Sequence, residues 1–231
     1  SDSRIAHARH SCSTFMLYLG VEGDFPGLAH HTILLAEDYR RNIAEIEAGV
    51  LPERPSLYLQ HAGATDPGMA PPGCSSLYLL VPVPNLRASG GAVDWAREAP
   101  RYRRLALDRL RVLGLHNIES RIRYERMVTP QDWHDEFAVG HGATFNLAHD
   151  LGQMLWFRPG NRFAEAPGVY LVGGGTHPGS GLPVIFEGAR ITADLLVRDL
   201  GLSPVPVPEA ARMQGRGPAT AASAAAWDPE R

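Results

Sequence analysis

The spacing of hydrophobic and polar positions predicts several strands in the first part of the chain. Residues 14–21 mix β-branched, aromatic and aliphatic side chains and end at Gly20 and Gly23, as a buried strand does. Residues 56–62 and 75–83 have the same character. Because a Pro- and Gly-rich segment separates these two runs, we expect an antiparallel hairpin with an irregular loop.

Helical spacing predicts two amphipathic helices among these strands. In residues 37–48, Tyr39, Ile43 and Ile46 recur at helical intervals until Gly49 ends the pattern. Residues 94–113 carry basic residues around one apolar stripe, and Pro100 is compatible with a helix that begins near it. A basic helix can lie on anionic lipid, but a solvated face above a core-facing stripe is the commoner arrangement. The stripe consists of Trp95, Ala99, Tyr102, Ala106, Leu110 and Leu113.

The last patterned segment predicts a strand, a glycine-rich turn and a helix. Residues 170–172 are apolar enough for a covered strand, and three glycines follow where the chain must turn. Pro183 marks the start of a helix, whose first N–H groups stabilise negative charge beside them. We expect a glycine-notched apolar face on this helix. That face consists of Ile185, Gly188, Ala189, Thr192 and Leu196.

The glycine-rich turn departs from the known nucleotide-binding patterns. Gly179 stands one place too late for GxGxxG, and no acidic residue follows about 20 residues on. A glycine turn that merely packs a helix on a strand explains the same residues. A hydrolase is disfavoured although Ser180 has His177 nearby, because Pro178 interrupts the GxSxG signature.

Composition and charge exclude some classes of function. The 231 residues are 44% hydrophobic, which suffices for a buried core, and the net charge of -3 gives no basic surplus for binding nucleic acid. Cys12 and Cys74 are too few for a disulfide framework, and we expect both to be small core residues. No stretch approaches the roughly 20 apolar residues that span a bilayer.

Histidines and carboxylates give no metal-binding spacing. His30 and His31 are adjacent, so we expect their side chains to diverge on a strand, and HExxH does not occur. Thr129 and Pro130 predict the start of another helix. The nearby carboxylates are most simply favourable charges at that N-terminus, although a paired-carboxylate site uses the same residue types. They are Asp132, Asp135 and Glu136.

Seven segments together resemble the C-terminal half of bacterial and fungal phytoene desaturases, which are FAD-dependent, amine-oxidase-like enzymes of carotenoid biosynthesis. The segments are STFMLYLGV, LAHHTILLAEDYRRNI, PSLYLQHAGATDPGMAPPGCSSLYLLVPVPN, MVTPQDW, HGATFNL, WFRPGNR and YLVGGGTHPGSGLPV. They follow in order over residues 11–200. The GGGTHPGSGLP part is the most specific.

The resemblance implies a mixed α+β and α/β fold. An antiparallel-sheet substrate domain would occupy residues 1–155, with its N-terminal part missing, and residues 156–200 would be the returning strand and helix of a Rossmann-like FAD-binding domain. Residues 201–231 are Pro- and Ala-rich, and we expect a disordered tail there.

By the same resemblance, the cofactor is FAD, bound by the glycine-rich segment and the helix start. The expected cofactor-binding residues are Gly173, Gly174, Gly175, Thr176, Gly181, Leu182, Pro183 and Val184. No catalytic residue and no metal ligand is assigned. The family's N-terminal GxGxxG does not occur, so we expect a fragment that cannot hold FAD tightly alone.

The implied reaction removes two hydrogens from a C–C single bond beside a polyene, with hydride passing to FAD. The expected substrate is an apolar polyene such as phytoene, facing side chains such as Tyr58, Tyr78 and Leu80. Quinone or oxygen would accept the electrons. Since the substrate arrives from lipid, we expect a bacterial cytoplasmic protein in peripheral contact with the inner membrane. Alternatives are a related carotenoid or retinoid isomerase or saturase, or a non-catalytic lipid-binding remnant.

Overall fold

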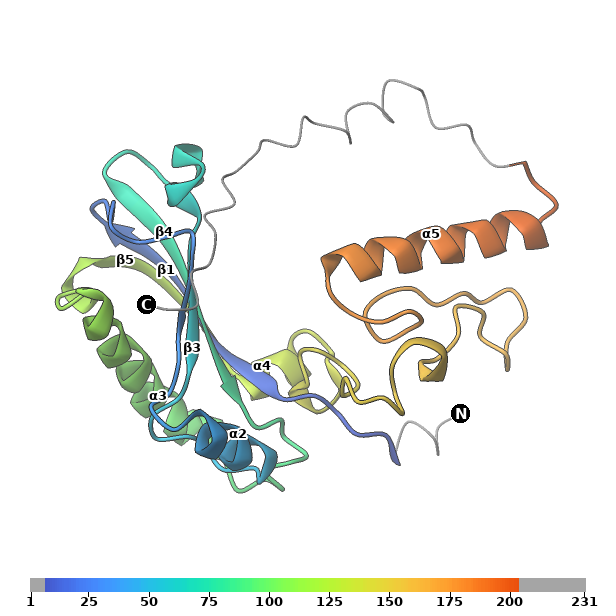
Figure 1. Cartoon of the computed structure of the whole chain (residues 1–231), viewed down its shortest axis with the longest axis horizontal. Coiled ribbons are helices and arrows are strands. Elements are labelled where there is room, and N and C mark those ends of the chain that lie inside the picture. Colours follow the sequence, from blue (N-terminus) through green and yellow to red (C-terminus); the bar gives the residue numbers. More distant parts are fainter. Residues whose placement is uncertain (1–6, 204–231) are drawn as a thin grey trace, which may run out of the picture.

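A five-stranded antiparallel sheet organises the larger part of the chain (Figure 1). The computed structural model describes residues 7–203. In space, the strands follow the order β2-β3-β4-β1-β5. Their bounds are Ser13–Glu22 for β1, His31–Leu34 for β2, Leu57–His61 for β3, Cys74–Val83 for β4 and Ile122–Val128 for β5.

The sheet confirms the strands predicted at residues 14–21, 56–62 and 75–83. Strands β3 and β4 pair antiparallel, and the Pro- and Gly-rich connection between them contains two 3₁₀ turns, Ala62–Ala64 and Pro67–Met69. The chain adds β2 and β5 at the two edges, which the hydrophobic pattern did not single out. Both edge strands are half exposed and carry charged or polar side chains, so their sequence signal is weak.

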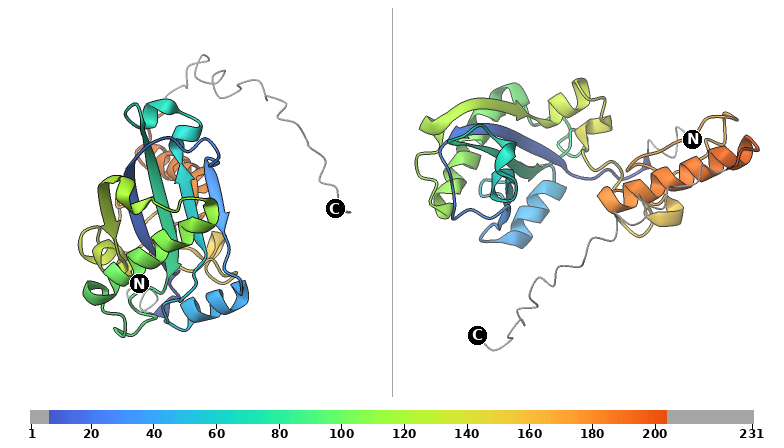
Figure 2. Two further views of the ribbon diagram at one scale, coloured as in Figure 1. Left: turned by 90° about the vertical axis from the view of Figure 1, so that its left-hand side faces the viewer. Right: turned by 90° about the horizontal axis from the view of Figure 1, so that it is seen from above.

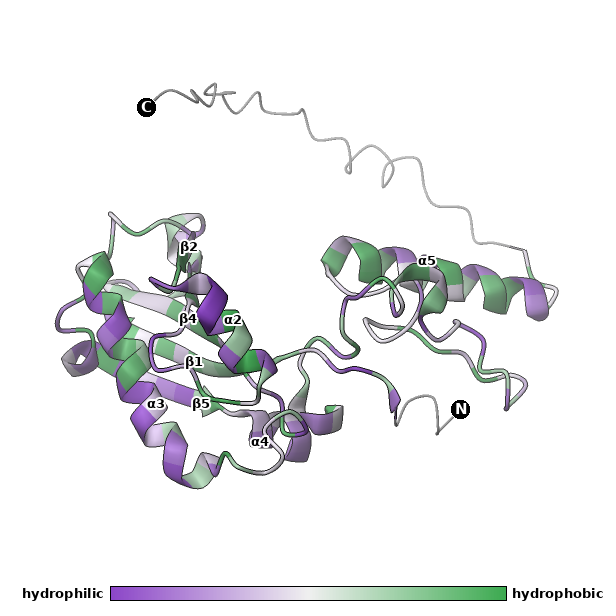
Figure 3. Cartoon of the chain, turned by 60° about the horizontal axis from the view of Figure 1, so that its bottom comes forward, coloured by the Kyte–Doolittle hydropathy of each residue, from purple (hydrophilic) through white to green (hydrophobic). Residues whose placement is uncertain are grey.

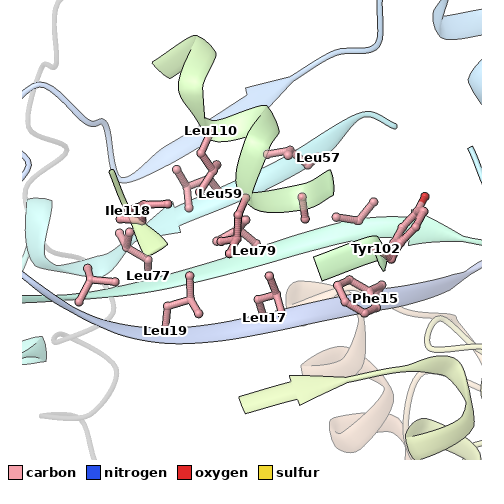
Figure 4. Packing of buried hydrophobic residues seen from close by; sticks show 14 of the residues in the cluster. Phe15, Leu17, Leu19, Leu57, Leu59, Leu77, Leu79, Tyr102, Leu110 and Ile118 are labelled. Atoms are coloured by element: carbon pink, nitrogen blue, oxygen red, sulfur yellow. The ribbon is translucent and has the colours of Figure 1, made fainter. Parts of the chain in front are cut away.

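Side-chain alternation gives the sheet one buried face. Leu17 of β1 lies opposite Leu79 of β4, and Leu19 lies opposite Leu77. Because successive side chains point to opposite faces, all of these leucines share one side of the sheet. Figure 4 shows them packed with residues from the covering helix. The labelled residues are Phe15, Leu17, Leu19, Leu57, Leu59, Leu77, Leu79, Tyr102, Leu110 and Ile118.

Helix α3 covers this face, and α2 lies at the rim of the sheet. Helix α2 spans Tyr39–Glu47 and α3 spans Trp95–Arg109, continued by a 3₁₀ turn over Leu110–Leu113. The Asp94 carboxylate caps α3 by accepting hydrogen bonds from the Ala96 and Arg97 amides. The apolar stripe of α3 is buried against the sheet, which confirms the core-facing arrangement and leaves no stripe for lipid.

Two details of the helix predictions need correction. Helix α3 begins at Trp95, so Pro100 lies inside it and the helical hydrogen bond to the Ala96 carbonyl is lost. In α2, Ile46 is buried, but Tyr39 and Ile43 are exposed. A short helix on the rim of a sheet buries only the residues that reach over the core.

A short helix packs against the start of β1. Helix α4, Pro130–Asp135, begins with the predicted Thr129 cap, which forms a capping box with Asp132. The Trp133 indole N–H donates to the Thr14 carbonyl at 3.1 Å and so ties α4 to β1. The local charge pattern is therefore explained by helix capping.

The final helix, α5, spans Leu182–Asp199 and stands apart from the sheet with the segments that precede it (Figures 1 and 2). The strand predicted at residues 170–172 is wrong. Tyr170 forms only an isolated bridge with Arg162, and Val172 is 58% exposed. A strand needs neighbours to pair its backbone groups, and the described residues supply this one bridge.

The two cysteines do not lie in the core. Cys12 and Cys74 are free thiols, but both are half-buried, so neither is the small core residue we expected. Residues 204–231, which contain most of the predicted tail, lie outside the described residues. The domain boundary at residue 155 stays a prediction.

Two glycines with left-handed backbone provide a matched test of the fold. Gly49 has φ +78°, and a Cβ there would lie 2.1 Å from the Ala88 carbonyl oxygen. Gly114 has φ +81° but open space at the same position. Both Ala substitutions cost about 1–2 kcal/mol of backbone strain. We expect Gly49→Ala to lower the free energy of unfolding by about 1–3 kcal/mol more than Gly114→Ala, because only Gly49 adds a clash. Equal denaturation midpoints in urea would contradict this packing.

Candidate functional site

The face of the sheet opposite the leucine core carries a row of aromatic rings. Tyr18 stacks on Tyr78 with ring centroids 5.5 Å apart, and Tyr58 meets Tyr78 edge-on at 5.7 Å. His31 continues the row by stacking on Tyr58, and its Nδ1 lies 2.7 Å from the Tyr58 hydroxyl. The row therefore crosses β2, β3, β4 and β1.

Burial raises the pKa of both Tyr18 and Tyr78 above the ordinary tyrosine value, so these two hydroxyls stay protonated at neutral pH. Leu80 lies beside the row. The side chains of Tyr18, Tyr58, Tyr78 and Leu80 are half-buried, whereas His31 is exposed. The sheet thus offers a firm surface of rings and aliphatic groups on this side, of the kind that suits a long apolar molecule.

The two adjacent histidines do not diverge as predicted. Their ring centroids lie 4.2 Å apart, because His30 precedes β2 and is not bound by the alternation of a strand. Nδ1 of His30 lies 2.6 Å from the Thr65 hydroxyl, and the Gln60 amide nitrogen lies 3.2 Å from its Nε2. Across the part of the chain that the structure describes, no group of three or more His, Cys, Asp or Glu side chains is arranged to hold a metal ion.

The glycine-rich segment folds on itself in a way that separates its glycines into two kinds. A Cβ on Gly174 would lie 3.0 Å from the Ser180 Cβ, and one on Gly175 would lie 3.3 Å from the Asn146 Oδ1. These two glycines serve packing within the segment. Gly173, at φ +124°, has no atom within 4 Å of its Cβ position. A ligand can therefore approach the backbone at Gly173.

The remaining predicted cofactor-binding residues lie at the start of α5. Thr176 is buried, and its hydroxyl donates to the Gly173 carbonyl at 2.9 Å, so it closes the turn. Gly181 is the N-cap of α5, with open space at its Cβ position and no side-chain cap. Leu182 and Pro183 are exposed and Val184 is half-buried. The uncapped amide groups of this first turn remain available to an anion.

Polar contacts hold α5 against the preceding segments. Gly188 is buried, with the His177 carbonyl 3.4 Å from its Cβ position, and the Thr192 hydroxyl donates to the Leu171 carbonyl at 3.0 Å. The Asn161 amide donates to the His177 carbonyl at 3.0 Å. The predicted glycine-notched face is thus confirmed at Gly188 and Thr192. Ile185 is half-buried, whereas Ala189 and Leu196 are exposed, so the prediction is wrong for these two residues.

An ion pair fixes the far end of α5. The Arg162 guanidinium donates to both carboxylate oxygens of Asp199, at 2.7 and 2.6 Å, and the Tyr170 hydroxyl donates to the same carboxylate at 2.6 Å. Together these donors lower the pKa of Asp199 to about 2, with the Arg162 hydrogen bonds the largest cause. The carboxylate is exposed to solvent, so this clamp orients the helix more than it stabilises it.

Two residues near the glycine-rich segment were missed by the sequence patterns. His149 Nε2 lies 2.5 Å from the Ser180 hydroxyl. Arg158 is only 3% exposed, and its Nη2 donates to the Leu147 carbonyl at 3.2 Å. His149 belongs to no recognisable spacing. Arg158 stands in the WFRPGNR segment that carried the family resemblance, but no binding role was assigned to it there.

His177, the histidine close to Ser180 in sequence, is not its hydrogen-bond partner. Ser180 pairs with His149, whereas His177 directs its Nδ1 to the Leu155 carbonyl at 2.9 Å and stacks on Trp156. Burial lowers the pKa of His149, and the positive charge of Arg158 adds to this effect. The pair still lacks the strand-turn-helix elbow of an activated serine, so it gives no support to a hydrolase.

A cleft of about 720 Å³ lies between the N-terminal segment and α2. His10, Asn85 and Arg87 supply polar lining, and Ile43 supplies an apolar part. His149 also lines it, and none of the predicted cofactor-binding residues does. Burial lowers the pKa of His10, which also packs edge-on against His141 at 4.7 Å.

Comparison with known proteins gives close relatives by sequence. No model of a known protein family matches the chain. The 4,4'-diapophytoene desaturase (4,4'-diapolycopene-forming) of Methylomonas sp is 49% identical over 81% of this chain and 36% of its own length. The all-trans-zeta-carotene desaturase of Myxococcus xanthus is 42% identical over 89% and 39%. The phytoene desaturase (lycopene-forming) of Pseudescherichia vulneris is 42% identical over 82% and 38%.

The chain thus spans somewhat more than a third of the length of these relatives. Among solved structures, an oxidoreductase from Methanosarcina mazei superposes with a TM-score of 0.47 at 13% identity, over 84% of this chain and 36% of that chain. That likeness is too distant to support an argument.

The pKa of His149 provides a test of the site geometry. Because its folded-state pKa lies below the ordinary value of 6.5, the neutral imidazole is favoured, and stability is lost as the pH falls through about 6.5. We expect Arg158→Gln to raise the pKa of His149 part of the way back, since it removes a positive charge and leaves the burial. The measurement is an NMR titration of the imidazole. Arg162→Gln is the control, and an identical shift in both variants would contradict the proximity of Arg158 and His149.

Proposed function

The chain belongs to the phytoene desaturase family of carotenoid desaturases, and from this premise we propose that it is part of an FAD-dependent enzyme that oxidises C–C single bonds of a polyene in carotenoid biosynthesis. The observation that carries the proposal is the 49% identity over 189 residues to a diapophytoene desaturase. Other relatives of similar coverage are named for phytoene and zeta-carotene. We therefore propose a phytoene-type polyene as substrate.

The open aromatic face of the sheet supports a polyene substrate. Tyr18, Tyr58, Tyr78 and Leu80 form a half-buried apolar surface that the α2 and α3 side of the sheet does not use. Covering such a surface with hydrocarbon yields about 25 cal/mol per Å² of apolar area removed from water. The protonated hydroxyls of Tyr18 and Tyr78 need no counterion.

The start of α5 supports a flavin nucleotide. Gly173 and Gly181 leave the backbone open, and the first turn of α5 has neither a side-chain cap nor an acidic residue. Nearby, Arg158 holds two buried N–H groups that lack a partner among the described residues, and unpaired donors of this kind suit an anionic cofactor. When bound, FAD would supply the hydride acceptor. The residues of this chain would approach it and stabilise negative charge.

Exposed apolar side chains on and around α5 support a longer protein. Leu182 and Phe186 are 72% and 71% exposed, and Figure 3 shows hydrophobic residues along much of the helix. A surface this apolar is typical of an interface. We propose that residues outside this chain cover it and complete the cofactor domain.

Electron transfer and localisation follow from the chemistry of the substrate. We propose quinone or oxygen as the final acceptor, and peripheral contact with the inner membrane of a bacterium, because a water-insoluble polyene must be drawn from lipid. Within residues 7–203, none of the helices is long and apolar enough to cross a bilayer. A peripheral contact requires no such helix.

The proposed activity is tested on the full-length protein. We expect the purified protein to carry FAD near a 1:1 ratio and to convert phytoene in liposomes into a product with a longer conjugated chain, seen as a red-shifted absorption spectrum. This chain alone should bind FAD far more weakly. Isomerised or saturated products would contradict the proposed desaturation and indicate a related carotenoid isomerase or saturase. Retention of phytoene without turnover would indicate a lipid-binding protein.

A charge on the open sheet face provides a sharper test of the substrate surface. We expect Leu80→Lys to reduce phytoene turnover at least about tenfold, because a lysine facing an apolar substrate must be desolvated. Val112→Lys, at a position 68% exposed on the other side of the sheet, is the matched control and should leave turnover unchanged. Circular dichroism checks that both variants fold. Equal turnover in the two variants would rule out this face.

A further inference from the structure

Arg158 is a buried cation with unused donors. Its side chain is almost completely shielded from solvent at 3% exposure, yet only Nη2 has a described hydrogen bond, to the Leu147 carbonyl. Nε and Nη1 are buried and unpaired within residues 7–203. A guanidinium carries five N–H groups and stays charged, so leaving two nitrogens without acceptors is unfavourable unless a ligand supplies them.

No carboxylate of the described chain neutralises this charge by contact. Asp150 is the acid that interacts with it electrostatically, but the Asp150 carboxylate forms its ion pair with Arg9 at 3.6 Å. Positive neighbours are absent from direct contact as well, since the adjacent His149 is held towards its neutral form. The surroundings therefore favour an incoming anion.

The position of Arg158 connects it with the start of α5. A Cβ built on Gly179, at φ +144°, would lie 3.8 Å from the Arg158 Nε and 3.9 Å from the Val184 Cγ1. Arg158 thus lies beside the loop that enters the first turn of α5. That turn belongs to an 18-residue helix and lacks both a side-chain cap and an acidic residue. Both the helix N-terminus and the guanidinium lie beside the loop at Gly179, and both favour negative charge there.

We propose that Arg158 is an anion-binding residue of the flavin site, which donates its unpaired Nε–H to an anionic oxygen of the flavin nucleotide. The inference rests on the proposed function. Two kinds of oxygen in FAD have this chemistry: the oxygens of the diphosphate, and the carbonyl oxygen at the pyrimidine edge, which carries negative charge in the reduced flavin. Each accepts a charge-assisted hydrogen bond from a guanidinium.

The test compares Arg158→Gln, Arg158→Lys and the control Arg54→Gln, whose side chain pairs with Glu37, in the full-length protein. We expect Arg158→Gln to raise the Kd for FAD at least about tenfold, Arg158→Lys to raise it less because charge without the planar fork remains, and Arg54→Gln to leave it unchanged. Binding is followed by quenching of flavin fluorescence in the apoprotein. If Arg158→Gln does not fold, Arg158→Lys and wild type decide the outcome.

Two further measurements distinguish the oxygens. If Arg158 binds the diphosphate, inorganic pyrophosphate competes with FAD in wild type but not in Arg158→Gln, and riboflavin binds both equally. If it binds the pyrimidine edge, riboflavin binding also weakens and the midpoint potential of bound FAD falls in the variant. An unchanged Kd and potential in folded Arg158 variants would overturn the inference and leave the proposed function intact. A wild-type protein that binds no flavin would overturn both.

Discussion

The pairing of β1 with β4 is the constraint on which the rest of the sheet depends. The two strands stay in register over ten residue pairs, from Ser13 opposite Val83 to Glu22 opposite Cys74. Because side chains alternate, this register sends Leu17, Leu19, Leu77 and Leu79 to the face that α3 covers, and sends the tyrosines and Leu80 to the open face. Each fully buried leucine contributes about 1.5–3 kcal/mol of transfer free energy. A slip by one residue would exchange the two faces and forfeit most of that contribution.

The open face is a consequence of the same pairing. Tyr18 and Tyr78 lie directly opposite each other in the β1–β4 register, and Tyr58 lies one strand further, so their rings meet in a row. The helices that bury the leucines cannot reach this side. The sheet therefore separates a structural face from a surface that remains available for an apolar ligand.

The segment around α5 follows a different principle. Its contacts are polar and local, through Asn161, Thr192 and the clamp on Asp199, while large apolar side chains of the helix stay exposed. The unpaired donors of Arg158 and this uncovered apolar surface both lack partners among residues 7–203. The chain spans little more than a third of its relatives' length.

Local signals in the sequence determined the elements whose stability is local. The strands of the β3–β4 hairpin, the core-facing stripe of α3 and the helix start at Thr129 and Pro130 were all predicted, because alternation, helical spacing and capping act over a few residues. The family was predicted from its motifs. The edge strands β2 and β5, the contact of His30 with His31 and the pairing of Ser180 with His149 were decided only by tertiary structure. Each joins residues whose meeting depends on the path of the chain between them.

In the glycine-rich segment, the sequence determined some features and the tertiary structure decided others. The sequence determined the turn and the start of α5 at Leu182, since glycine and proline restrict the backbone directly. It wrongly predicted a strand at residues 170–172, because a strand exists only where neighbours pair its N–H and C=O groups. Tertiary structure alone decided which glycines pack internally and which leave space, and it alone placed Arg158 beside them. Burial and unpaired donors are properties of a packed neighbourhood, and no spacing in the sequence encodes them.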